Sequence, residues 1–261
     1  MLLNYRQYSN TGTPLLILHG LFGSLGNWGW HSKNLSEHFA VIGVDLRNHG
    51  ESFHGSEFNY PIMANDVVEL MDHLKISSGY FIGHSMGGKV SMELALTHSD
   101  RVEKCIVVDI APITYPDKAD GHLQIISGMK AMALDKISSR KEAEQRLVEF
   151  VEDEATRNFV LTNLVRNDAG KYRWCLNLEY IESNYARLRE KPSEGEAFTK
   201  PTLFIKGAIS KYIQSKHEAE ILQLFPNANV KIIMQAGHWL HVEKPQVLQK
   251  VVLDFLQAKD T

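Results

Sequence analysis

One short motif constrains the fold of this chain more than any other feature. The motif is Gly83-His84-Ser85-Met86-Gly87, which has the form G-x-S-x-G. It follows directly on the apolar run Tyr80-Phe81-Ile82, and a helical pattern over 88–96 begins directly after it. A serine flanked by glycines between a strand and a helix is the sequence form of a nucleophile elbow, because a Cβ at either glycine would collide with its neighbours. We therefore expect Ser85 on a sharp turn, with its Oγ pointing into open space.

The remaining sequence alternates short apolar strands with helical patterns in two blocks, 1–113 and 201–261. The unbroken apolar runs favour a parallel sheet that is covered on both faces. Between 114 and 200 we find helical periodicity and almost no strand pattern. The predicted fold is therefore an α/β-hydrolase fold, with a mostly parallel central sheet flanked by helices and an inserted helical cap over 114–200. Strands are expected at 15–18, 41–44, 80–82, 105–108, 201–205 and 230–234, and helices at 62–74, 88–96, 217–224 and 245–256.

Composition excludes several classes of protein. A net charge of −3 over 261 residues gives no electrostatic reason to bind nucleic acid or an anionic membrane. The first residues lack the apolar region of a signal peptide, and no apolar run approaches the length of a membrane span. Cys105 and Cys175 are far apart in the sequence and do not form a disulfide framework. We expect a cytoplasmic enzyme with no nucleic-acid or membrane partner.

A serine hydroxyl needs a base within hydrogen-bond reach, and the base needs an orienting acid. In this fold the chain order is serine, acid, histidine, which makes His238 the candidate base. His238 lies in a loop just past the last predicted strand, at the same sheet edge as the elbow. His241 is expected to be structural, His84 to point away from the serine Oγ, and His19 to shape a loop.

The acid does not stand at its commonest position. The loop after the penultimate strand reads Lys206-Gly207-Ala208-Ile209-Ser210, with a serine where an aspartate is usual. Asp109 follows the strand 105–108, whose end borders the site, and we expect it to reach the imidazole. Asp45, in a loop, and Asp66, on a helix face, are the competing carboxylates. Ser210 either adds a hydrogen bond to this network or is an inert loop hydroxyl.

An acyl-transfer site also needs two N–H donors for the oxyanion of its tetrahedral intermediate. The backbone N–H of Met86 is the first candidate. The second is expected in the loop 19–23, from Leu21 or, as an alternative, Phe22; the competing interpretation is a glycine-rich turn without a catalytic role. We expect Phe22, Met86, Ile110 and Trp239, together with side chains of the insert, to line a pocket suited to an apolar acyl chain.

Taken together, five motifs resemble the YbfF-like esterases, a group of small cytosolic α/β-hydrolases, over the whole length of the chain. The resemblance implies hydrolysis of carboxylic esters and thioesters, including acyl-CoA, without a cofactor. It implies Ser85 as nucleophile, His238 as base and Asp109 as acid, with Ser210 at the characteristic serine position. The motifs are His19-Gly20-Leu21-Phe22-Gly23-Ser24, Asp45-Leu46-Arg47-Asn48-His49-Gly50-Glu51-Ser52, Gly83-His84-Ser85-Met86-Gly87-Gly88, Val108-Asp109-Ile110-Ala111-Pro112 and Phe204-Ile205-Lys206-Gly207.

The predicted reaction is acyl transfer from a small-molecule ester or acyl-CoA to water, through an acyl-enzyme on Ser85. No histidine, cysteine and aspartate cluster has the spacing of a metal site, so no metal is expected. Two other interpretations remain open. The same residues serve carbon–carbon bond hydrolases and lactonases, and a hydrolase fold can also act as a non-catalytic ligand receptor.

Overall fold

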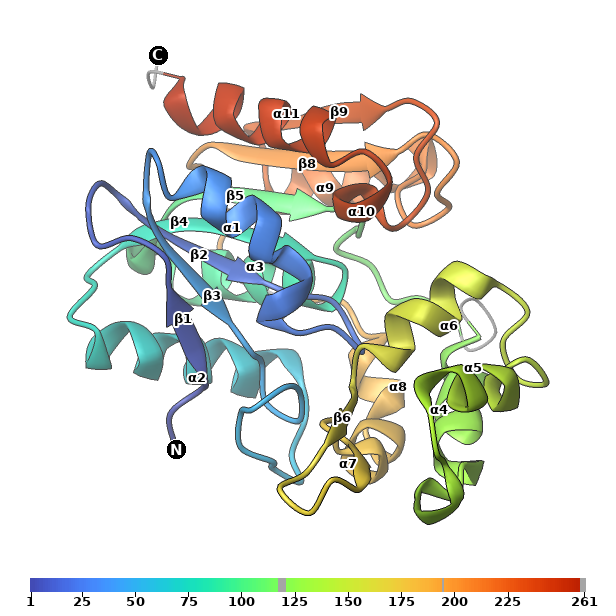
Figure 1. Cartoon of the computed structure of the whole chain (residues 1–261). Coiled ribbons are helices and arrows are strands. Elements are labelled where there is room, and N and C mark those ends of the chain that lie inside the picture. The colour runs from blue at the N-terminus through green and yellow to red at the C-terminus, as the bar shows by residue number, and fades with distance from the viewer. Residues whose placement is uncertain (117–120, 194, 259–261) are drawn as a thin grey trace.

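The computed structural model describes residues 1–116, 121–193 and 195–258 of the chain. Its centre is a seven-stranded sheet with the strand order β1-β3-β2-β4-β5-β8-β9 (Figure 1). All neighbouring strands are parallel except β1, which runs antiparallel to β3. The predicted mostly parallel sheet is thus confirmed. The strands are β1 (Tyr5–Gln7), β2 (Pro14–Leu18), β3 (Ala40–Val44), β4 (Gly79–His84), β5 (Val102–Val108), β8 (Thr202–Gly207) and β9 (Ala228–Ile233).

Strand β1 has no counterpart among the predicted strands. It has three residues, and its burial pattern is one half-buried side chain followed by two exposed ones. A strand this short at the edge of a sheet has no apolar run or alternation to reveal it. Its place depends on pairing with β3, which is distant in the sequence.

Helices cover both faces of the sheet, as the unbroken apolar strands predict. Alternate residues of β2 enter different cores: Leu15 and Ile17 pack with α1 and α11, whereas Leu16 and Leu18 pack with α2, α3 and α9. In Figure 1, α1 and α11 accordingly lie on one face of the sheet and α2 and α3 on the other. The helices of these layers are α1 (Gly29–Leu35), α2 (Tyr60–His73), α3 (Met86–Thr97), α9 (Glu218–Leu224), α10 (Leu240–Glu243) and α11 (Pro245–Gln257).

The segment 114–200, called the insert below, lies between β5 and β8 in the sequence, and its described residues lie toward the carboxyl ends of the parallel strands (Figure 1). The buried ammonium group of Lys89, from α3, donates to the Ile113 and Arg189 carbonyls near the two ends of the insert, at 2.7 and 3.2 Å. The predicted range 114–200 includes 117–120 and 194, which lie outside the described residues. The insert contains α4 (His122–Ala131), α5 (Arg140–Leu147), α6 (Glu154–Leu161), β6 (Leu164–Arg166), β7 (Tyr172–Trp174), α7 (Leu178–Ser183) and α8 (Tyr185–Leu188).

The expectation that the insert has almost no strand structure is wrong at one place. Strands β6 and β7 form an antiparallel hairpin. Its turn is closed by Gly170, which has a φ of +74° and donates its N–H to the Asn167 carbonyl at 2.8 Å. Strands of three residues are too short to show an alternating pattern, so the sequence did not predict the hairpin.

In the part of the chain that the structure describes, no helix is both long and apolar enough to span a membrane. In the same residues, no group of three or more histidine, cysteine, aspartate and glutamate side chains is arranged to hold a metal ion.

Candidate active site

Ser85 stands between β4 and α3 in a strained backbone conformation, with φ +52° and ψ −116°. Its N–H donates to the Val108 carbonyl at 3.0 Å, which ties the turn to the end of β5. The flanking glycines are required by contact: a Cβ at Gly83 would lie 2.1 Å from the Gly87 carbonyl oxygen, and one at Gly87 would lie 2.3 Å from the Leu18 carbonyl oxygen. The local geometry is that of a nucleophile elbow.

Asp109 and His238 meet at the carboxyl end of the sheet. The Asp109 carboxylate is fully buried at the end of β5, and its Oδ2 lies 2.7 Å from Nδ1 of His238. Its Oδ1 accepts the Gly207 N–H at 3.0 Å, and Oδ2 also accepts the Ser210 hydroxyl. The His238 ring stacks on Tyr212, with centroids 4.1 Å apart. Three of these contacts fix the carboxylate, and the fourth fixes the imidazole plane.

Ser85 and His238 line the same cavity, which has a volume of about 170 Å³. Within the described residues, the Ser85 Oγ has no hydrogen bond to His238. Such contacts are often long in sites without substrate and tighten in the reacting complex. Ser85 and the imidazole that contacts Asp109 thus lie at the same cavity.

The other candidate bases are engaged elsewhere. Nε2 of His84 lies 2.9 Å from the backbone carbonyl of His238, so its ring is turned to the loop rather than to the Ser85 Oγ. His241 stacks on Trp28 at 4.8 Å, and burial lowers the pKa of its imidazole to about 3. His19 accepts the Leu46 N–H at 3.0 Å and contacts the Gly20 carbonyl with its other nitrogen.

The two predicted alternatives for the second oxyanion donor, Leu21 and Phe22, differ in whether their N–H group already has an acceptor. The Phe22 N–H donates to Nε2 of His49 at 3.2 Å, and burial lowers the pKa of that imidazole to about 3, which keeps Nε2 an acceptor. Leu21 and Met86 have no acceptor for their N–H groups among the described residues. Gly20 lies so close that a Cβ there would be 3.2 Å from the Ser85 Cβ. Of the two predicted alternatives, Leu21 is therefore the one with an available donor.

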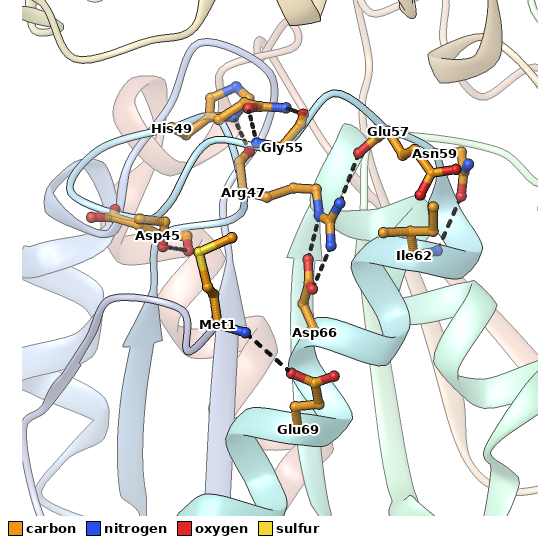
Figure 2. Close-up of polar contacts among 12 residues, drawn as sticks. Met1, Asp45, Arg47, His49, Gly55, Glu57, Asn59, Ile62, Asp66 and Glu69 are labelled. Carbon is orange, nitrogen blue, oxygen red and sulfur yellow. Dashed lines mark hydrogen bonds and ion pairs between the residues drawn. The ribbon is translucent and has the colours of Figure 1, made fainter.

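Both competing carboxylates bind groups of the loop after β3: Asp45 lies in that loop, and Asp66 lies on α2. Asp45 accepts the side-chain amide of Asn4 and the N–H groups of Leu25 and Glu51. Arg47 binds Asp66 through two hydrogen bonds, one of them 2.6 Å long from Nη2, and also donates to the Glu57 carbonyl at 2.7 Å (Figure 2). Asp45 thus organises the loop and Asp66 attaches it to α2, while Asp109 is the carboxylate that contacts His238.

The cavity walls contain the predicted residues and others that the sequence did not reveal. Phe22 and Trp239 line the cavity of about 170 Å³, and Met86 and Ile110 line a second one of about 30 Å³. Ser85 lines both cavities. No motif marked the contributions of the insert, because they come from helix faces whose place is set by tertiary packing. The insert contributes His122, Ile125, Thr156, Phe159 and Val160 to the larger cavity.

His122 was missed altogether by the sequence reasoning. It begins helix α4, its Nδ1 lies 2.9 Å from the Tyr185 hydroxyl, and its ring stands edge-on to Phe22. Burial lowers the pKa of the His122 imidazole to about 3, so the ring is neutral at physiological pH. A histidine at the start of a helix in the insert was the one available signal, and by itself it pointed to no site.

Comparison with known proteins identifies the family of this chain. The family described as alpha/beta hydrolase fold matches residues 13–245. Esterase YbfF of Escherichia coli is 34% identical over 96% of this chain and 95% of its own. The sn-1-specific diacylglycerol lipase ABHD11 of Mus musculus is 38% identical over 93% of this chain and 80% of its own. A solved structure described as a marine microorganism esterase superposes with a TM-score of 0.94 at 37% identity, over 97% of this chain and 99% of that one. The chain therefore belongs to the α/β-hydrolase fold family and, within it, to the YbfF-like esterases.

Proposed function

We propose that this protein is a serine hydrolase that cleaves carboxylic esters, and acyl-CoA thioesters as a second substrate class. The proposal rests above all on the contact of 2.7 Å between Asp109 Oδ2 and His238 Nδ1, beside a serine in the elbow conformation. The names of the E. coli and mouse relatives, an esterase and a diacylglycerol lipase, support ester substrates.

In the proposed reaction, the Ser85 Oγ attacks the carbonyl carbon while Nε2 of His238 takes the hydroxyl proton. Asp109 holds the Nδ1–H tautomer and stabilises the imidazolium that forms. The carbon–oxygen or carbon–sulfur bond to the leaving group then breaks, and His238 returns the proton to that group. Water activated by His238 hydrolyses the acyl-enzyme and regenerates the Ser85 hydroxyl.

The remaining site residues have supporting roles in this proposal. The N–H groups of Leu21 and Met86 bind the oxyanion, and Ser210 stabilises the Asp109 carboxylate through its hydrogen bond. Phe22, Ile110 and Trp239 line the substrate pocket. The insert, residues 114–200, acts as a cap on the core formed by 1–113 and 201–261, because its α4 and α6 side chains close the larger cavity.

One feature favours acyl-CoA as a second substrate class. A groove of about 570 Å³ reaches His238 along the loop after β8, and Lys211 and Lys216 are among its described lining residues. Their ammonium groups suit the phosphates of a coenzyme A leaving group. The leaving group must lie on the side of His238, since this residue protonates it.

The decisive test compares Ser85→Ala with the parent protein on p-nitrophenyl acetate and on acetyl-CoA. The substitution removes one hydroxyl, so the fold should persist while kcat falls on the order of 10⁶-fold on both substrates. Labelling by a fluorophosphonate should disappear in parallel. A folded Ser85→Ala protein that keeps a tenth of the activity would refute the nucleophile assignment.

A paired substitution separates the two substrate classes. Lys211→Ala combined with Lys216→Ala should raise KM for acetyl-CoA and leave p-nitrophenyl acetate hydrolysis within about twofold. If the parent protein hydrolyses p-nitrophenyl acetate but not acetyl-CoA, the thioester part of the proposal is refuted and the ester part stands.

A further inference from the structure

One hydrogen bond joins the insert to the loop that contains the proposed oxyanion donor. Asn163 is a buried residue between α6 and β6, and its side-chain Nδ2 donates to the Phe22 carbonyl at 2.7 Å. The same Nδ2 donates to the Val160 carbonyl at 3.0 Å, at the end of α6. Val160 itself lines the larger cavity. A single amide group thus connects a cavity-lining helix of the insert with the loop after β2.

The contacts of Asn163 leave one orientation for its amide. Both N–H donors of Nδ2 point to carbonyl oxygens, whereas Oδ1 accepts the weak S–H donor of Cys175 at 3.6 Å. Rotating the amide by half a turn would place its oxygen against the two carbonyls and leave both without a donor. The Cys175 N–H also donates to the backbone carbonyl of Asn163 at 3.0 Å, which fixes the backbone beneath the amide.

Phe22, the acceptor of this bond, has a backbone conformation that is costly for a residue with a side chain. Its φ is +59°, and it is the third residue of a turn closed by the Gly23 N–H and the Gly20 carbonyl at 3.0 Å. Glycine or asparagine is usual at such a position, because positive φ crowds a Cβ. The Phe22 backbone is bound on both sides, by His49 at its N–H and by Asn163 at its carbonyl.

We propose that Asn163 is a positioning residue that couples the insert to the oxyanion hole by holding the Phe22 carbonyl. Leu21 lies between Phe22 and Gly20, and Gly20 packs against Ser85. In this proposal, the bonds that hold Phe22 also keep the neighbouring Leu21 N–H in its direction. Oxyanion donors act through their fixed placement before reaction. The Asn163 bond completes that placement by tying the loop after β2 to the insert. The inference rests on the proposed function, because it assigns Leu21 to the hole.

The test replaces Asn163 with leucine, which has a similar size and no donor. Loss of a whole oxyanion donor costs about 10²–10³ in kcat, and a donor that is misplaced rather than removed costs less. We expect Asn163→Leu to lower kcat for p-nitrophenyl acetate by about tenfold to a hundredfold, with KM within about twofold. Affinity for an alkyl trifluoromethyl ketone, whose adduct with a serine bears an oxyanion, should fall with kcat.

Asn184, which is half-buried whereas Asn163 is buried, supplies a control for the loss of an amide in the insert. It also lies in the insert, and its Nδ2 donates to two carbonyls, those of Ser56 in the core and Tyr180 in the insert, both at 2.9 Å. Its core partner belongs to the loop after β3 and not to the loop after β2. Asn184→Leu should therefore leave kcat, KM and ketone affinity within about twofold.

A second measurement does not depend on activity. Hydrogen exchange of the Phe22 amide should be at least about tenfold faster in Asn163→Leu, because the bond to His49 weakens when the carbonyl side is released. Asn163→Ser, whose shorter side chain cannot span to Phe22, carries the same expectations if the leucine variant does not fold.

Unchanged kcat and unchanged Phe22 exchange in a folded Asn163 variant would overturn the proposal, and so would equal effects of the Asn163 and Asn184 substitutions. A rise in KM alone would also overturn it, since it would place Asn163 in substrate binding rather than in transition-state stabilisation. Ser85→Ala, assayed in parallel, separates this result from the function: activity retained there refutes the nucleophile whatever Asn163 does.

Discussion

Replacing Asp109 with asparagine tests the proposed triad through the geometry of one carboxylate. The backbone N–H of Gly207 donates to Oδ1 at 3.0 Å and cannot rotate away. An asparagine at this position must therefore keep its oxygen toward Gly207 and turn its NH₂ group toward His238. A donor facing Nδ1 stabilises the tautomer with the proton on Nε2, so the imidazole can no longer accept the Ser85 proton.

The magnitude follows from this forced tautomer. A comparable change in a serine protease triad costs about 10⁴ in kcat, and the Gly207 constraint leaves this enzyme no better orientation of the amide. We expect a loss of about 10⁴, give or take tenfold, which corresponds to about 5 kcal/mol in the activation free energy. Ser210→Ala removes one hydrogen bond to the same carboxylate and should cost on the order of 1 kcal/mol, or about fivefold in rate.

The assay is kcat on p-nitrophenyl acetate for Asp109→Asn, Asp45→Asn and Ser210→Ala, each checked for folding by circular dichroism. Asp45→Asn is the control because its carboxylate binds loop donors rather than His238. Ser210→Asp in the Asp109→Asn background should recover part of the loss, since that loop faces the same imidazole. The reasoning is refuted if Asp45→Asn cripples a folded enzyme while Asp109→Asn is mild.

Three further predictions concern stability, the pocket and metals. Burial lowers the pKa of His49, His122 and His241 to about 3, against about 6.5 in an unfolded chain. The unfolded state therefore binds more protons between pH 6.5 and 3, and stability should fall by about 1.4 kcal/mol per pH unit for each histidine as the pH drops through that window. Urea unfolding at pH 7, 5.5 and 4.5 measures this pH dependence, and equal free energies of unfolding would contradict the prediction. His241→Phe should reduce the slope of stability against pH by the contribution of about one proton. Phe159→Ala removes a ring whose centroid lies 4.1 Å from that of Trp239 in the cavity wall, so substrate preference should shift toward p-nitrophenyl esters with longer acyl chains. An unchanged ranking of acyl-chain lengths would argue against the insert as a cap. EDTA should leave ester hydrolysis unchanged, and activity that a chelator abolishes and zinc or manganese restores would disprove the metal-free mechanism.

Several features of the fold could be predicted because they are written in local sequence. The central parallel strands contain uninterrupted apolar runs, such as 15–18, 80–82 and 105–108, because both faces of the sheet are buried there. The glycines beside Ser85 are required by contacts within about 2.3 Å of a would-be Cβ, which no other residue tolerates. Asp109 could be singled out because it follows a strand whose end must lie beside the elbow in a parallel sheet.

Other features were decided by contacts between segments far apart in the chain. Whether Leu21 or Phe22 offers a free N–H depends on His49, which takes the Phe22 donor from a neighbouring loop. The Ser210 hydroxyl was equally consistent with a silent role until the fold placed it on the Asp109 carboxylate. The residues adjacent in sequence to Phe22 and Ser210 do not reveal either of these contacts.

The insert marks the limit of what the sequence by itself determined. Its helical periodicity indicated helices, but a period says only that one face is apolar and not which surface covers it. Packing onto the core decided that Phe159 faces the cavity and that Asn163 reaches the Phe22 carbonyl. Strand pattern and close-approach glycines are local constraints and are visible in the sequence, whereas the partners of a helix face or a buried amide are set by the energy of the whole packed chain.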